Sequence, residues 1–83
     1  MEKQRNALSV LAYNRPGVLV KVATVISGQG LNIHEMTARV SNDPDFTRID
    51  IDFLADVEKL RLVQGHLQRL EVVKEVTLLN DVL

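Results

Sequence analysis

The sequence changes its hydrophobic period at residues 14–19, which read NRPGVL. Before this segment, residues 7–13 alternate Leu8, Val10 and Ala12 with the side chains between them, a pattern typical of a strand with one buried face. Pro and Gly after a short polar residue can turn the chain, and Pro is preset for the first position of a helix. After the turn, six apolar residues fall on one broad helical stripe: Val18, Leu19, Val22, Ala23, Val25 and Ile26. We therefore expect a helix over residues 16–27, which Gly28 and Gly30 stop.

The second half of the chain repeats the strand and helix patterns. Residues 33–40 and 47–54 predict two strands, and the turn at residues 41–45 is too short for a parallel crossover, so the pair is an antiparallel hairpin. Residues 56–70 predict an amphipathic helix that Asp56 caps, and residues 72–79 predict a last strand. Gly65, inside this helix, is either a tolerated weakness or a point of close backbone approach, and the first reading is favoured.

This order of elements predicts an α+β chain with the ferredoxin-like βαββαβ fold, a four-stranded antiparallel sheet with both helices on one face. The other face of the sheet has no cover of its own. Polar side chains are expected on it: Glu35, Arg39, Arg48, Asp50 and Asp52.

The length, cysteine content and charge of the chain exclude several classes of function. We expect 83 residues to form a single domain, 1–83, with a core at about 7–80, and so modest a core favours association with another chain. No cysteine is present, which excludes disulfides and thiolate chemistry and suits the cytoplasm. A net charge of −1, with Lys and Arg scattered among Asp and Glu, disfavours nucleic acid, and no apolar stretch predicts a membrane span or signal peptide.

Catalytic and metal-binding patterns are not evident. The serines have no recognisable His and carboxylate partners, Asp50 and Asp52 alternate onto one solvated face, and His34 and His66 are far apart. The Gly28-Gln29-Gly30 segment ends a helix rather than opening one, which is the wrong context for a dinucleotide phosphate. We therefore expect no catalytic residue, no metal site and no cofactor in this chain.

The turn at residues 14–19 has one chemical property that can matter. The free N–H groups at the start of its helix, at the positive end of the helix dipole, can receive a carboxylate. Most turns from a strand into a helix look like this and bind nothing, so the signal is weak alone.

The turn gains meaning because the chain resembles the ACT domains, small regulatory modules of ferredoxin-like fold that pair side by side and bind amino acids at their interface. Residues 14–19 and 30–37 (GLNIHEMT) carry the general resemblance. The hairpin 42–51 (NDPDFTRIDI) and the segment 66–76 (HLQRLEVVKEV) resemble more specifically the N-terminal ACT domain of the regulatory small subunit of acetohydroxyacid synthase, or acetolactate synthase. The resemblance covers nearly all of the chain after Ala7.

The resemblance implies a ligand site shared by two protomers, in which one supplies the turn after the first strand and the other the start of the second. Asn14 and Asn32 would hydrogen-bond the amino acid, usually valine, and Leu19 and Ile33 would form part of an apolar wall. The backbone that would receive the carboxylate is that of Pro16, Gly17, Val18 and Leu19. The chemistry agrees, since amide oxygens can accept from the ammonium while a helix start binds the carboxylate.

The resemblance therefore implies a non-catalytic regulatory subunit, a homodimer, that acts on the catalytic subunit of acetolactate synthase, to which the thiamine diphosphate would belong. One alternative is a free-standing amino-acid sensor that acts on another protein or on gene expression, and another is a dimerisation module with an empty site. Longer members of the family carry a second domain. This chain is expected to be a short single-domain regulator or a product that activates its enzyme without inhibiting it.

Overall fold

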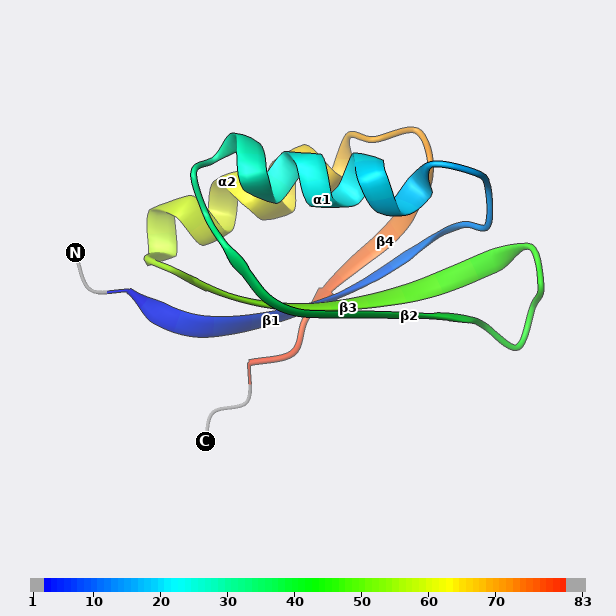
Figure 1. Cartoon of the computed structure of the whole chain (residues 1–83), viewed down its shortest axis with the longest axis horizontal. Coiled ribbons are helices and arrows are strands. Elements are labelled where there is room, and N and C mark those ends of the chain that lie inside the picture. The colour runs from blue at the N-terminus through cyan, green and yellow to red at the C-terminus, as the bar shows by residue number, and fades with distance from the viewer. Residues whose placement is uncertain (1–2, 81–83) are drawn as a thin grey trace.

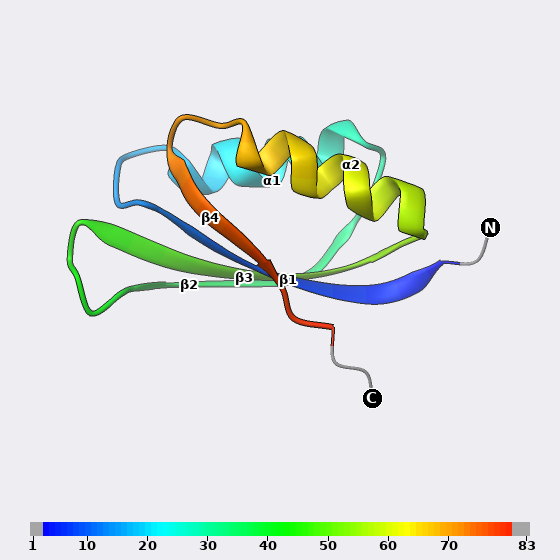
Figure 2. The same cartoon turned by 180° about the vertical axis from the view of Figure 1, so that it is seen from behind.

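One antiparallel sheet carries both helices on the same face, as Figures 1 and 2 show from opposite sides. The computed structural model describes residues 3–80. The elements are β1 (Gln4–Tyr13), α1 (Val18–Gly28), β2 (Ile33–Val40), β3 (Phe46–Ala55), α2 (Val57–Gln68) and β4 (Val73–Leu78). This order confirms the predicted ferredoxin-like βαββαβ fold.

The sheet has the strand order β2-β3-β1-β4, so the first and third strands are central and β2 and β4 form its edges. Leu8 of β1 pairs with Ile51 of β3 and with Leu78 of β4, and every neighbouring pair is antiparallel. One residue is inserted at each edge: His34 interrupts the pairing of β2 with β3, and Lys74 interrupts that of β4 with β1. Each edge strand, β2 and β4, therefore carries one residue without a partner in the neighbouring strand.

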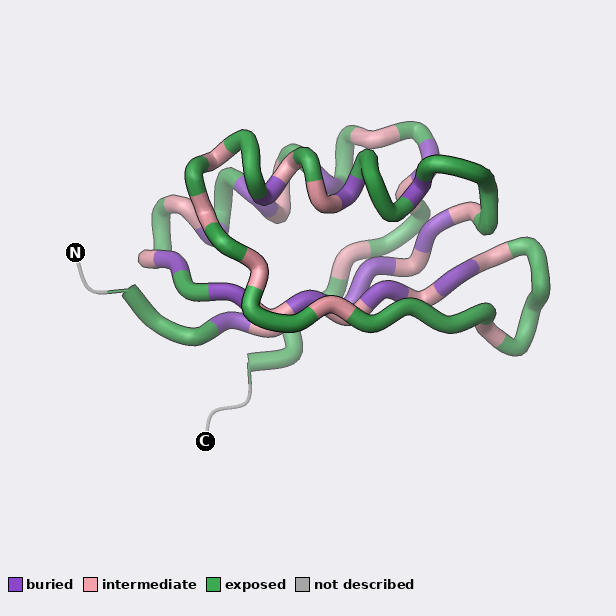
Figure 3. Tube along the Cα trace, in the orientation of Figure 1, coloured by how far each residue is buried: buried purple, intermediate pink, exposed green. Residues whose placement is uncertain are grey.

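The core lies between the sheet and the helices, and the tube in Figure 3 shows buried residues alternating with half-buried ones along most of β3. Because side chains alternate along a strand, every second residue of each central strand faces the helices. The helices complete the core with most of the predicted stripes, but Leu19 of α1, which the sequence places in its stripe, is 43% exposed. The residues at its centre are Leu8, Val10, Ala12, Val22, Ile26, Ile49, Ile51, Phe53, Val63 and Leu67.

The first helix begins later than expected. Pro16 lies in the turn, and Gly17, with φ 82°, is the cap before Val18. The expectation that Pro16 occupies the first helical position is therefore wrong, because the left-handed Gly17 delays the helix. At the other end Gly28 still belongs to α1, and it is Gly30, with φ 76°, that reverses the chain.

The second helix begins as predicted and ends at Gln68, two residues earlier than expected. The Asp56 carboxylate accepts a hydrogen bond of 2.8 Å from the Lys59 amide and so caps the helix. A Cβ placed on Gly65 would meet no heavy atom within 4 Å. Within residues 3–80, no other backbone approaches that glycine closely, which favours the reading as a tolerated weakness.

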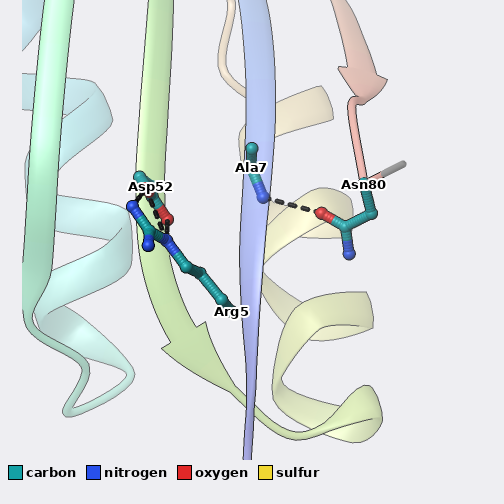
Figure 4. Close-up of polar contacts among 4 residues, drawn as sticks. All are labelled: Arg5, Ala7, Asp52 and Asn80. Atoms are coloured by element: carbon teal, nitrogen blue, oxygen red, sulfur yellow. Dashed lines mark hydrogen bonds and ion pairs between the residues drawn. The ribbon is translucent and has the colours of Figure 1, made fainter. Parts of the chain in front are cut away.

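The uncovered face of the sheet is polar, as predicted. Figure 4 shows the Arg5 guanidinium against the Asp52 carboxylate, with hydrogen bonds of 2.5–3.1 Å. These bonds hold the pKa of Asp52 below its ordinary value and raise that of Arg5. The figure also shows Asn80, beyond β4, accepting a 2.7 Å hydrogen bond from the Ala7 amide. Within residues 3–80, neither helix has the length and apolarity needed to cross a membrane.

Candidate functional site

A groove of about 330 Å³ lies where the turn into α1 meets the ends of β2 and β3. Four of the seven predicted site residues line it, and four further residues contribute: Arg15 from the turn, Val20 from the helix, and Ala38 and Thr47 from the two strands. The lining residues include Asn14, Gly17, Val18, Leu19, Val20, Ala38 and Thr47. Pro16 lies in the same turn without lining the groove, and Asn32 and Ile33 lie elsewhere.

The start of α1 offers hydrogen-bond donors to this groove. The Val18 amide donates to the Arg15 carbonyl at 3.2 Å, and the Gly17 carbonyl accepts from the Lys21 amide at 3.0 Å. Among residues 3–80, the amides of Gly17, Leu19 and Val20 have no backbone partner, and no side chain caps the helix. Pro16 has no N–H to give. The free donors at this helix start are therefore those of Gly17, Leu19 and Val20, next to the positive end of the dipole.

The side chain of Asn14 is held by the hairpin between β2 and β3. The Asn14 amide group donates from Nδ2 to the Pro44 carbonyl at 3.3 Å, and its backbone N–H donates to the Asp45 carbonyl at 2.8 Å. This bond uses one N–H of Nδ2, and Oδ1 remains an acceptor. An acceptor beside free amides is the combination that an amino-acid zwitterion requires, with its ammonium on the first and its carboxylate on the second.

Asn32 and Ile33 lie at the opposite end of β2 from the groove. Ile33 pairs with Phe53 near one end of β3, whereas Val40 pairs with Thr47 near the other. Ala38, the β2 residue that lines the groove, lies five residue steps from Ile33, or about 16 Å along the strand, so one amino acid cannot contact Asn14 and Asn32 of the same chain. The structure thus places four of the predicted residues in one groove, whereas Asn32 and Ile33 of the same chain lie at the other end of β2.

Four groove residues are not among those predicted from the sequence: Arg15, Val20, Ala38 and Thr47. The strand pattern carried a signal for two of them, because Ala38 and Thr47 share the inward face near the hairpin. Arg15 and Val20 follow only from the path of the turn. In the part of the chain that the structure describes, no three His, Asp or Glu side chains are grouped to hold a metal ion.

Residues 8–83 match the family model described as the AHAS small subunit-like ACT domain. The chain belongs to this family. Three curated relatives, all acetolactate synthase small subunits, illustrate the relationship. The Mycobacterium avium protein is 32% identical over 98% of this chain and 48% of its own length. The corresponding values are 31%, 93% and 47% for Haemophilus influenzae, and 33%, 93% and 47% for isozyme 3 of Escherichia coli. This ACT domain chain therefore spans about half the length of the curated relatives it matches.

Solved structures agree with this assignment. The acetolactate synthase small subunit of Thermotoga maritima superposes with a TM-score of 0.81 and 29% identity, over 90% of this chain and 47% of that one. The ACT domain of a GTP pyrophosphokinase from Chlorobium tepidum gives a TM-score of 0.80 at 17% identity, over 99% and 92% of the two chains. The second likeness concerns the fold alone.

Proposed function

We propose that two copies of this ACT domain bind a branched-chain amino acid, valine first among them, between the Asn14 groove of one copy and the Asn32 end of β2 of the other. The observation that carries the proposal is the position of these two half-sites at opposite ends of an edge strand. Within residues 3–80, no strand pairs with the outer side of β2. That side is free to pair with a second copy.

A two-fold axis beside the middle of β2, between the two paired edge strands, would join the half-sites. Antiparallel pairing of two such strands places the beginning of one beside the end of the other, so Ile33 of one copy would lie opposite Val40 of the second. Asn32 would then face the groove of the second copy. The apolar residues exposed at this edge support the pairing, since Leu19, Val20 and Val40 are 43%, 68% and 57% exposed.

The pocket formed in this way has the chemistry of an amino-acid site. Free amides at the start of α1 bind the carboxylate, and the side-chain oxygens of Asn14 and Asn32 accept from the ammonium. Leu19 and Ile33 contact the aliphatic side chain. An apolar pocket separates valine, leucine and isoleucine by about 1–3 kcal/mol.

The regulated enzyme is proposed from the family. The curated relatives are small subunits of acetolactate synthase. The chain accordingly acts as a non-catalytic regulatory subunit in the cytoplasm and responds to the amino acid on behalf of a thiamine-diphosphate-dependent catalytic subunit. Amino-acid binding stabilises the dimer by mass action, because the ligand contacts both copies.

Mixing two variants tests the shared site. Calorimetric titration with each of the twenty amino acids defines the ligand, and Asn14→Ala and Asn32→Ala should each abolish or strongly weaken its binding. When the two variants are mixed and allowed to exchange, each mixed dimer regains one site in which both asparagines are intact. About a quarter of all sites should then bind, since half of the dimers are mixed.

Asn42→Ala, an exposed hairpin asparagine outside the groove, is the control and should bind as the wild type does. If mixing restores no binding while the single variants remain dimers, the site is not shared between copies. Capture of the acetolactate synthase catalytic subunit by the tagged chain tests the partner. Binding of valine without capture would instead support a free-standing sensor.

A further inference from the structure

We propose that the uncovered face of the sheet holds a second site, which binds a carboxylate or phosphate group carried by a molecule with an apolar part. It is a groove of about 530 Å³ beside the hairpin between β2 and β3, the hairpin at the right of Figure 1. Its lining includes three cations and two apolar side chains: Arg39, Arg48, Lys74, Leu11 and Phe46.

The pairing of like charges points to an anion. Arg39 of β2 and Arg48 of β3 are direct cross-strand partners. Like charges placed opposite each other destabilise a sheet, so this pair breaks a local rule of strand pairing. Such departures are expected where a function compensates for them, and an anion bound between the two guanidinium groups removes their repulsion.

The protein neutralises this positive charge only in part, through Asp50 and Asp43. Arg39 Nη1 lies 3.6 Å from Asp50 Oδ2, with 65% of the arginine side chain exposed. Arg48 donates to the neutral Ser9 Oγ at 2.8 Å. Asp43 is the one carboxylate among the groove's described lining residues, and its Oδ1 already accepts from the Asp45 amide at 3.0 Å. The groove therefore has an excess of positive charge on a chain whose net charge is −1.

Lys74 and the apolar residues of the groove indicate which kind of molecule carries the anionic group. Lys74 is the inserted residue of β4, and its Nζ lies 4.5 Å from the centre of the Phe46 ring. Phe46 in turn packs against Tyr13, with ring centres 5.0 Å apart. Half-buried Leu11 and Phe46 provide contact for an apolar group, while the two arginines provide bidentate donors for a carboxylate or phosphate.

This site is separate from the proposed amino-acid site. Ala38 and Thr47 face the helix side and line the first groove, whereas the next residues along each strand, Arg39 and Arg48, face the uncovered side. Substitutions on the uncovered side should therefore leave valine binding unchanged, and either proposal can fail without the other.

The test uses four probes at low ionic strength: inorganic phosphate, phenyl phosphate, whose ring supplies the apolar part, citrate and a tetra-glutamate peptide. Phenyl phosphate should bind more tightly than inorganic phosphate because its ring contacts Leu11 and Phe46. Binding is followed by calorimetry and by the backbone amide shifts of residues 39–48. We expect citrate and tetra-glutamate to bind the wild type, and Arg48→Gln and Arg39→Gln to weaken each affinity roughly tenfold, the effect of losing one charge-assisted hydrogen bond. Arg61→Gln is the matched control. It makes the same change of charge at an exposed position of α2, outside the groove, and should bind as the wild type does.

The probes also distinguish the source of the anion. Tighter binding of citrate or phosphate indicates a free small molecule, and binding of tetra-glutamate at least tenfold tighter than citrate indicates an acidic segment of a protein. Because Arg39 is exposed, its variant remains informative if Arg48→Gln fails to fold. The proposal is overturned if no probe binds more strongly than chloride does, or if the two groove variants and Arg61→Gln bind the probes equally.

Discussion

Replacing Gly17 with alanine tests how the turn before α1 is built. Gly17 caps the helix with φ 82° and ψ −1°, in the left-handed region that side chains with a Cβ disfavour. The amides proposed to receive a carboxylate belong to this residue and the turn that follows it. The substitution therefore perturbs both the stability of the domain and the geometry of the candidate site.

The expected loss of stability is about 1 kcal/mol. A left-handed conformation costs an L-residue about 1–2 kcal/mol, and alanine recovers about 0.4–1 kcal/mol because it restricts the unfolded chain. A Cβ on Gly17 meets no heavy atom within 4 Å, so no steric term is added. For a chain of 83 residues, this loss lowers the melting temperature by roughly 4–8 °C.

Two other glycines make the measurement specific. Gly30 has φ 76° and equally open surroundings, so Gly30→Ala should cost about as much. Gly65 lies inside α2 with open space around its Cβ and no positive φ, so Gly65→Ala should raise the stability by about 0.5–1 kcal/mol. Urea unfolding at one fixed protein concentration compares the three variants, because dimerisation would make stability depend on concentration.

The sign of each change decides the outcome. If Gly17→Ala is as stable as the wild type, or if it shifts in the same direction as Gly65→Ala, the left-handed turn does not limit the choice of residue and the reasoning fails. Titration of the same samples with valine measures how each substitution affects amino-acid binding. We expect Gly17→Ala to lose affinity because the amides it presents move with the turn.

Three further outcomes follow from individual contacts. Asp56→Ala should lower the free energy of unfolding by about 1 kcal/mol, because the Lys59 amide loses its cap; urea unfolding measures it. The hydrogen bonds from Arg5 lower the pKa of Asp52 in the folded state. Their stabilisation is therefore full above the unfolded pKa of about 3.9 and is lost as the pH falls through the folded value. In Asp52→Asn, this part of the acid dependence should be absent from melting curves. Asn80→Ala should cost about 1 kcal/mol and speed hydrogen exchange of the β1 amide it binds, and unchanged exchange would contradict that role.

The periods of the sequence determined most of the fold. Alternation along β1 and β3 and the stripes of α1 and α2 fix which side chains are buried, because a strand repeats every two residues and a helix every 3.6. A turn of five residues fixes the antiparallel hairpin. The start of α1 was misplaced because Pro16 can begin a helix, and the left-handed conformation of Gly17 is a property of the folded turn.

Part of the candidate site could likewise be predicted from the sequence, and part depended on the tertiary structure. The turn and the start of the second strand could be recognised from residues 14–19 and 30–37, since both are local patterns. Their separation along β2, and the gathering of Arg39, Arg48 and Lys74 on the uncovered face, depend on which strands are neighbours and in what register. Register joins residues that are distant in the chain, so the sequence by itself determined the elements and the buried faces, and only the tertiary structure decided which residues share a groove.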